Sequence, residues 1–112
     1  MRHLLILAAC FTAGAAIWCY DCQSYWPHWS NFDPECELSD YDGKQALCYG
    51  CDTCWTRLMA NGSVYRGVWA EPRNDGVCDS NDDYVQCFCT SERCNTQLCD
   101  QCQFDLEDRF YV

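Results

Sequence analysis

Beyond residue 16, the apolar residues come in short alternating or clustered runs, which Pro, Gly, Asn and Asp interrupt. Such runs are typical of β-strands joined by turns, and none has the length and 3.6-residue period of an amphipathic helix. We therefore expect an all-β fold with long loops. Repeats, low-complexity tracts and linkers are absent, so the pattern predicts one domain over residues 17–98 and a short acidic extension over residues 99–112.

The clearest local element is a hairpin from Cys54 to Trp69. Asn61-Gly62 separates two strand-like runs there, and this dipeptide is the strongest short-range hairpin signal. A two-residue turn would place Arg57 opposite Arg66. It would also give that face four apolar side chains: Trp55, Met59, Val64 and Val68.

Two arginines in direct opposition across a strand pair repel each other. Two explanations stay open at this point. In one, the acidic segment 75–83 folds over the arginines and neutralises them. In the other, the hairpin presents a cationic patch with aromatic flanks to a partner.

Two further segments carry strand or loop signals. A second hairpin is expected between Cys78 and Cys87, with turn residues at 80–83 and a short strand at 84–86. The stretch 23–47 is a loop or a loose first hairpin. Its aromatic content is too high for a solvated loop: Tyr25, Trp26, Trp29 and Phe32.

The N-terminal residues 1–16 have the pattern of a signal peptide, with Arg2, an apolar run over 4–11 and small residues at 13–16. The apolar stretch is too short for a bilayer-spanning helix. One of the thirteen cysteines, Cys10, lies in this segment, so an even twelve remain. In the oxidising compartment that a signal peptide implies, most or all of the twelve are expected to form disulfides.

The remaining chain is small and acidic. Cross-links, more than core size, should therefore dominate its stability. After cleavage it has six basic and 17 acidic residues, a formal net charge of −11. This charge disfavours nucleic acid and anionic membrane surfaces as partners. Residues 103–112 lack the apolar tail of a GPI signal, so we expect a soluble, secreted, extracellular product without a GPI anchor.

Catalytic and metal chemistry find little support in the sequence. Four C-x-x-C spacings would suggest metal or redox chemistry in a cytosolic protein, but here they indicate disulfides. His28 is the one histidine left after cleavage, and no nucleophile pattern accompanies it, so we expect neither an enzyme nor a cofactor. The run Asp79-x-Asn81-x-Asp83 imitates the start of a calcium loop, but Tyr84 and Thr90 replace its glycine and glutamate.

Asn61-Gly62-Ser63 is an N-glycosylation sequon at the expected hairpin turn. Asn61 is therefore either a glycosylation site or a residue chosen for the turn alone, and the sequence leaves both readings open.

The two ends of the domain resemble a known family. Trp18-Cys19-Tyr20-Asp21-Cys22 at the start, and Cys87-Phe88-Cys89 followed by Cys94-Asn95 at the finish, are similar to the ends of the three-finger domain of the lymphocyte-antigen-6/urokinase-receptor superfamily. The likeness covers residues 19–95. Two departures are Phe88, which separates cysteines that are adjacent in the family, and Val68, where the family commonly has cysteine.

The resemblance implies three β-hairpin fingers projecting from a disulfide knot, with residues 54–69 as the middle finger. It implies four bonds: Cys19–Cys54, Cys22–Cys36, Cys78–Cys87 and Cys89–Cys94. It also implies that Asn95 hydrogen-bonds to the backbone of the knot.

Four cysteines remain without a partner from the resemblance, and they allow three connectivities. We favour bonds that join Cys48 and Cys51 to Cys99 and Cys102, because a bond within C-x-x-C closes a tight ring and gains little loop entropy. Such bonds would fasten the extension to the domain.

The expected function is that of a monomeric, secreted three-finger ligand or modulator of a membrane receptor, a channel or another extracellular protein, since such relatives commonly bind nicotinic-type receptors or other membrane proteins. Residue types enriched at binding hot spots provide the candidate surface: Trp26, Trp29, Arg57, Met59, Tyr65 and Arg66. The alternative is an acidic extracellular-matrix or mineral-associated protein that makes salt-sensitive contacts through segments 33–42 and 75–83. A venom toxin is disfavoured by the acidic charge.

Overall fold

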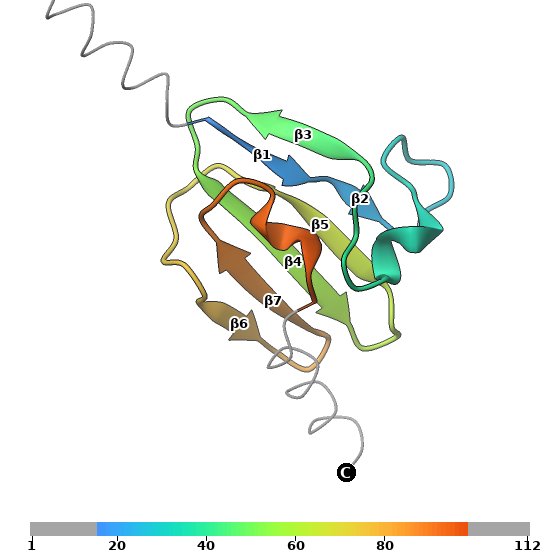
Figure 1. Cartoon of the computed structure of the whole chain (residues 1–112). Helices are drawn as coiled ribbons and strands as arrows, with labels where there is room; N and C mark the ends of the chain where they lie inside the picture. The colour runs from blue at the N-terminus through green and yellow to red at the C-terminus, as the bar shows by residue number, and fades with distance from the viewer. Residues whose placement is uncertain (1–15, 99–112) are drawn as a thin grey trace, which may run out of the picture.

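Two antiparallel sheets form the computed structural model, which describes residues 16–98 (Figure 1). The smaller sheet pairs β1 (Ile17–Tyr20) with β3 (Gln45–Cys48). The larger has the order β2-β5-β4-β7-β6. Its strands are β2 (Cys22–Gln23), β4 (Thr53–Met59), β5 (Val64–Trp69), β6 (Cys78–Ser80) and β7 (Tyr84–Cys89). Two 3-10 turns, η1 (Pro34–Glu37) and η2 (Cys94–Thr96), complete the secondary structure and confirm the predicted all-β class.

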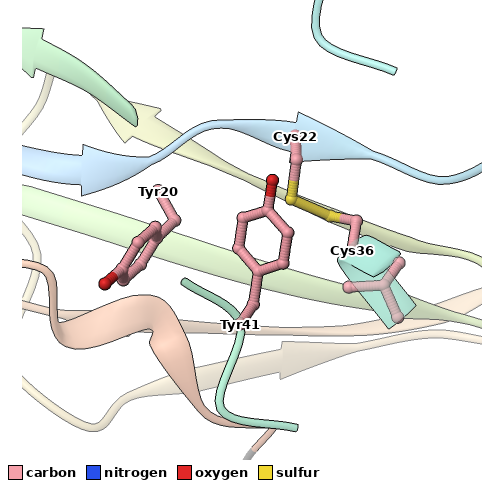
Figure 2. Packing of buried hydrophobic residues seen from close by; sticks show 5 residues of the cluster. Tyr20, Cys22, Cys36 and Tyr41 are labelled. Atoms are coloured by element: carbon pink, nitrogen blue, oxygen red, sulfur yellow. A yellow bond between two sulfur atoms is a disulfide. The ribbon is translucent and has the colours of Figure 1, made fainter. Parts of the chain in front are cut away.

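One face of the five-stranded sheet carries the core, and we call it the core face. The buried cluster there is small: Tyr20, Cys22, Cys36, Tyr41 and Val64. Figure 2 shows the Tyr41 ring between Tyr20 and the Cys22–Cys36 disulfide. The two tyrosine rings meet edge to face, with centroids 5.5 Å apart. Among residues 16–98, no helix is long and apolar enough to cross a membrane.

Disulfides supplement this small core. Five are present among the described residues: Cys19–Cys54, Cys22–Cys36, Cys48–Cys51, Cys78–Cys87 and Cys89–Cys94. Four of them are the bonds that the family resemblance implies. Cys19–Cys54 closes the longest sequence separation, 35 residues, and joins the two sheets.

The bond Cys48–Cys51 contradicts the favoured connectivity, in which both cysteines would bind the extension. The chain reverses directly after β3, where Gly50 takes a positive φ of 75° and brings the two Cα atoms within 5.4 Å. That separation suits a disulfide without displacing neighbouring backbone. Cys99 and Cys102, the signal peptide and the acidic extension lie outside the described residues.

The β4–β5 hairpin forms where predicted, but its register is shifted by one residue. Met59 donates its backbone N–H to the carbonyl of Ser63 at 2.9 Å, so three residues form the loop instead of two. Gly62 alone in this loop has a positive φ, 92°. This is a three-residue loop with glycine at its left-handed position, not the expected two-residue Asn-Gly turn.

The shift moves the two arginines to opposite faces of the sheet. Arg57 lies across from Tyr65, and Arg66 lies across from Thr56. The predicted opposition of Arg57 and Arg66 is therefore wrong, and no like-charge pair needs compensation. The acidic segment 75–83 forms its ion pair with a different residue, Arg73, through Asp79 at 2.8 Å.

The remaining two hairpins are β6–β7 and β1–β3. β6 and β7 pair between Cys78 and Cys87, as predicted. Asn81 shapes their turn, because its Oδ1 accepts hydrogen bonds from the backbone N–H groups of Asp83 and Tyr84. The first hairpin pairs β3 with β1, which lies before the stretch 23–47 where a loop or loose hairpin was expected. The residues between β1 and β3 contribute β2, η1 and a projecting loop (Figure 1).

Asn95 joins the end of the domain to its beginning, as the resemblance implies. Its Oδ1 accepts a hydrogen bond from the N–H of Tyr20 at 2.9 Å. Its Nδ2 donates to the carbonyls of Tyr20 and Trp55 at 2.9 and 3.0 Å. The side chain is only 2% exposed, so these bonds are shielded from water.

The Tyr41 hydroxyl gives the core a measurable signature. Burial and the hydrogen bond it donates to Asp33 at 2.7 Å raise the pKa of Tyr41 to about 12. We expect one tyrosine to titrate about two units later than an exposed one when absorbance is followed at 295 nm. Burial and the Asp42 carboxylate also raise the pKa of Tyr20, so the Tyr41→Phe variant should lose one late-titrating tyrosine and keep another. An unchanged number of late-titrating tyrosines would contradict the assignment.

The same shift predicts how stability changes at high pH. The unfolded chain releases this proton near its ordinary pKa of about 10, whereas the folded chain holds it until about 12. The tyrosine's stabilising contribution is therefore complete below about pH 10 and declines as the pH rises toward 12.

Candidate binding surface

A loop rich in aromatic residues, which we call the aromatic loop (residues 24–31), leaves the sheet after β2. The Gln23 side chain fixes its start. The Oε1 atom of Gln23 accepts from the N–H groups of Tyr25 and Trp26 at 2.9 and 2.6 Å, and its Nε2 donates to the Trp26 carbonyl at 2.8 Å. Because Gln23 is 1% exposed, the anchor itself lies within the protein.

The loop holds its large rings toward solvent. Tyr25, Trp26 and Trp29 are 49%, 47% and 59% exposed. Trp26 stacks with Trp29 at a centroid distance of 6.3 Å, and Tyr25 meets Trp26 edge to face at 4.8 Å. The predicted loop residues Trp26 and Trp29 are therefore exposed neighbours in a loop held by several hydrogen bonds.

The face of the sheet opposite the core, which we call the outer face, carries the predicted residues Arg57, Met59 and Tyr65. Arg57 is half-buried there. Its Nε donates to the Gln86 side-chain oxygen at 2.7 Å, and its Cζ lies 4.1 Å from the centroid of the Tyr84 ring. The Cζ atom of a second arginine, Arg73, lies 4.0 Å from the centroid of the Phe88 ring, which belongs to β7 of the same sheet.

The strand register relates the aromatic loop to the outer face. Gln23, which anchors the loop, pairs directly with Tyr65 on β5. Ser24 extends this connection, because its N–H donates to the Val64 carbonyl and its Oγ accepts from the Val64 N–H. The rings of the loop and the outer face are thus fixed to the same pair of strands.

The remaining predicted binding residue, Arg66, is not part of any surface. It is 1% exposed and points into the core face. Its guanidinium donates five hydrogen bonds to backbone carbonyls, at 2.7 to 3.3 Å. The acceptors belong to Cys36, Leu38, Asn95 and Thr96.

These acceptors make Arg66 a structural residue. The prediction that Arg66 belongs to a binding surface is therefore wrong. One guanidinium ties the η1 and η2 segments to β5. Burial lowers the pKa of Arg66 to about 10, so it still carries its positive charge at neutral pH. That charge strengthens its hydrogen bonds to the carbonyls.

Three residues that hold the surface side chains in place had no signal of this role in the sequence: Gln23, Tyr84 and Gln86. Gln86 is 29 residues from Arg57 and reaches it only through the pairing of β4 with β7. In the sequence, nothing distinguishes Gln23 from other polar strand residues. Its role follows only from the hydrogen bonds that its side chain makes to the aromatic loop.

The described residues contain no cluster of three or more His, Cys, Asp or Glu side chains arranged to hold a metal ion. The candidate surface consists of aromatic rings, arginines and amides on a cross-linked scaffold. This combination defines a small disulfide-rich β domain with an ordered, exposed aromatic loop. Comparisons of the chain with protein-family models, curated proteins and solved structures found no match.

Proposed function

We propose that the protein is secreted and acts as a three-finger binding protein, a ligand or modulator of a cell-surface receptor, a channel or another extracellular protein. The aromatic loop carries this proposal. Trp29 is 59% exposed although the loop around it is held by backbone and side-chain hydrogen bonds. Ordered, exposed tryptophans bind partners well because little conformational entropy is lost on association.

Further features support this class of protein. Four of the disulfides and the backbone contacts of Asn95 are those that the resemblance to three-finger proteins implies, which supports this proposal. Three hairpins, β1–β3, β4–β5 and β6–β7, extend from it and are the candidate fingers. Five disulfides in the described residues suit an oxidising, extracellular setting.

Binding to cells of the tissue that expresses the protein tests the proposal. We expect the double variant Trp26→Ser/Trp29→Ser to bind at least about tenfold more weakly than the wild type, since hot-spot residues each contribute about 2 kcal/mol or more. Tyr49→Ser is the matched control, because Tyr49 is 84% exposed but lies outside the loop. Its binding should equal that of the wild type.

The dependence of binding on salt concentration distinguishes this function from that of an acidic matrix-associated protein. A contact made by aromatic rings should persist at about 0.5 M salt, where exposed charges are largely screened. Unchanged binding of the loop variant, together with loss of wild-type binding at high salt, would favour the matrix-associated function and contradict the proposal.

A further inference from the structure

A hollow of about 340 Å³ opens on the outer face near the tips of the β4–β5 and β6–β7 hairpins. Six residues line it: Arg57, Met59, Ala60, Asn61, Asp83 and Tyr84. Arg57 provides the one cationic group among them. The hollow is distinct from the aromatic loop, whose rings do not line it.

The Arg57 guanidinium is held in a fixed orientation at this hollow. Gln86, which is 3% exposed, accepts the Nε hydrogen bond, and the Tyr84 ring lies against the guanidinium, with 4.1 Å between Cζ and the ring centroid. In the described part of the chain, the two terminal nitrogens of Arg57 donate no hydrogen bond, and no carboxylate oxygen lies within 4.0 Å of them. The N–H groups of these two nitrogens are therefore available to a ligand, and the contacts with Gln86 and Tyr84 fix their orientation.

The other described arginines already use their donors. Arg66 binds backbone carbonyls, Arg73 pairs with Asp79, and Arg93 contacts Glu92 and Gln45. The chain has 17 acidic residues and only seven basic ones, so an arginine without an acidic partner stands out among the residues described. The described residues around it hold the side chain and provide no counterion for its charge.

We propose that Arg57 binds a carboxylate of a protein partner, either an Asp or Glu side chain or a C-terminus, with its two terminal nitrogens donating to the two oxygens. Guanidinium and carboxylate match in this bidentate geometry. Tyr84 supports the plane of the guanidinium from one side. The acidic charge of the chain, −10, repels polyanions, which favours a single carboxylate over sulfated or phosphorylated chains.

Asp83 tunes the site. Asp83 is one of the residues that line the hollow, and no ion pair joins it to Arg57. A bound carboxylate would feel this like charge. Removing it by Asp83→Asn should therefore tighten carboxylate binding at least about twofold, since like charges that border the same surface hollow repel each other.

The test uses small probes, so it does not depend on the proposed function or on the aromatic loop. Because a glycan on Asn61 would stand beside the hollow, the chain is made in bacteria and refolded oxidatively. Acetate is titrated at constant ionic strength while the Nε–Hε resonances of the arginines are followed by NMR. We expect the Arg57 signal to move and saturate with a Kd of roughly 1–30 mM, the range of one weak polar contact.

Internal and variant controls make the titration decisive. The Arg73 signal, whose side chain is paired with Asp79, should stay nearly still. Arg57→Lys keeps the charge but loses the forked donors, and it should abolish saturable binding as judged from the Tyr84 ring signals. Phosphate at the same ionic strength should bind no tighter than acetate.

Three results would overturn the proposal. One is an Arg57 shift that does not saturate, or that Arg73 equals. Another is an Asp83→Asn variant with unchanged affinity. The third is phosphate binding more than about tenfold tighter than acetate, equal to about 1.4 kcal/mol, which would assign the hollow to phosphate-type anions.

Discussion

Replacing Arg66 by methionine should lower the free energy of unfolding by about 3–5 kcal/mol, the range for breaking a buried charged network. Methionine fills much of the same space but donates no hydrogen bond. The five donations to the carbonyls of η1 and η2 would be lost, leaving buried acceptors unsatisfied. Denaturant unfolding with the disulfides intact measures the effect.

Arg57→Met is the matched control for this prediction. It makes the same substitution on the same hairpin, but on the outer face, where only one hydrogen bond is lost. We expect a smaller cost, about 1–2 kcal/mol, because one buried acceptor, the Gln86 oxygen, loses its donor instead of several. Arg66→Lys should recover only part of the loss, since one ammonium cannot reach acceptors on two separate segments. Equal costs for Arg66→Met and Arg57→Met would refute the structural role of Arg66.

Asn95→Asp should be the second large effect, although the two side chains have nearly the same shape. The change replaces the Nδ2 donor with a carboxylate oxygen that faces the carbonyls of Tyr20 and Trp55. We expect a loss of about 3 kcal/mol or more at pH 7, because a buried charge then has acceptors in place of donors.

The pH dependence of this variant identifies the cause. Burial among acceptors disfavours the ionised form, so the new carboxyl should have a folded-state pKa above its unfolded value of about 3.9. Protonation restores one donor, and the deficit should therefore shrink as the pH falls toward 4. Asn74→Asp is the control, since Asn74 is exposed, and its cost should stay below about 0.5 kcal/mol at both pH values. A deficit for Asn95→Asp that is independent of pH would contradict the explanation.

Patterns of neighbouring residues in the sequence were sufficient to predict much of the fold. Alternating apolar runs predicted an all-β chain, and turn residues located the Cys78–Cys87 hairpin, because both depend on neighbours in sequence. The aromatic loop was visible from its composition alone. Its anchor was not, because Gln23 acts through side-chain hydrogen bonds that no sequence pattern marks.

The β4–β5 hairpin shows why the sequence did not predict which of its two arginines is buried. Asn61-Gly62 signals a turn, but it does not decide between a two-residue and a three-residue loop. A shift of one residue sends each side chain of a strand to the other face. The burial of Arg66 and the exposure of Arg57 follow from that single choice, and the choice depends on packing against Cys22 and η1, far away in sequence.

The Cys48–Cys51 bond also depends on local backbone conformation that a general rule about ring size does not include. Small rings of this kind are unfavourable in general, but the chain reversal at Gly50 brings the Cα atoms of these two cysteines within 5.4 Å. The general rule gave the wrong partner because it did not include the local backbone conformation.

The bonds from Asn95 to Tyr20 and from the Arg93 N–H to the Trp18 carbonyl also fix when this protein can finish folding. Synthesis proceeds from the N-terminus, so β1 exists long before the residues that hold it. The hairpins can form as they emerge, but the native domain can close only after Asn95 has left the ribosome. Until then the strand that begins the domain lacks its last backbone partners.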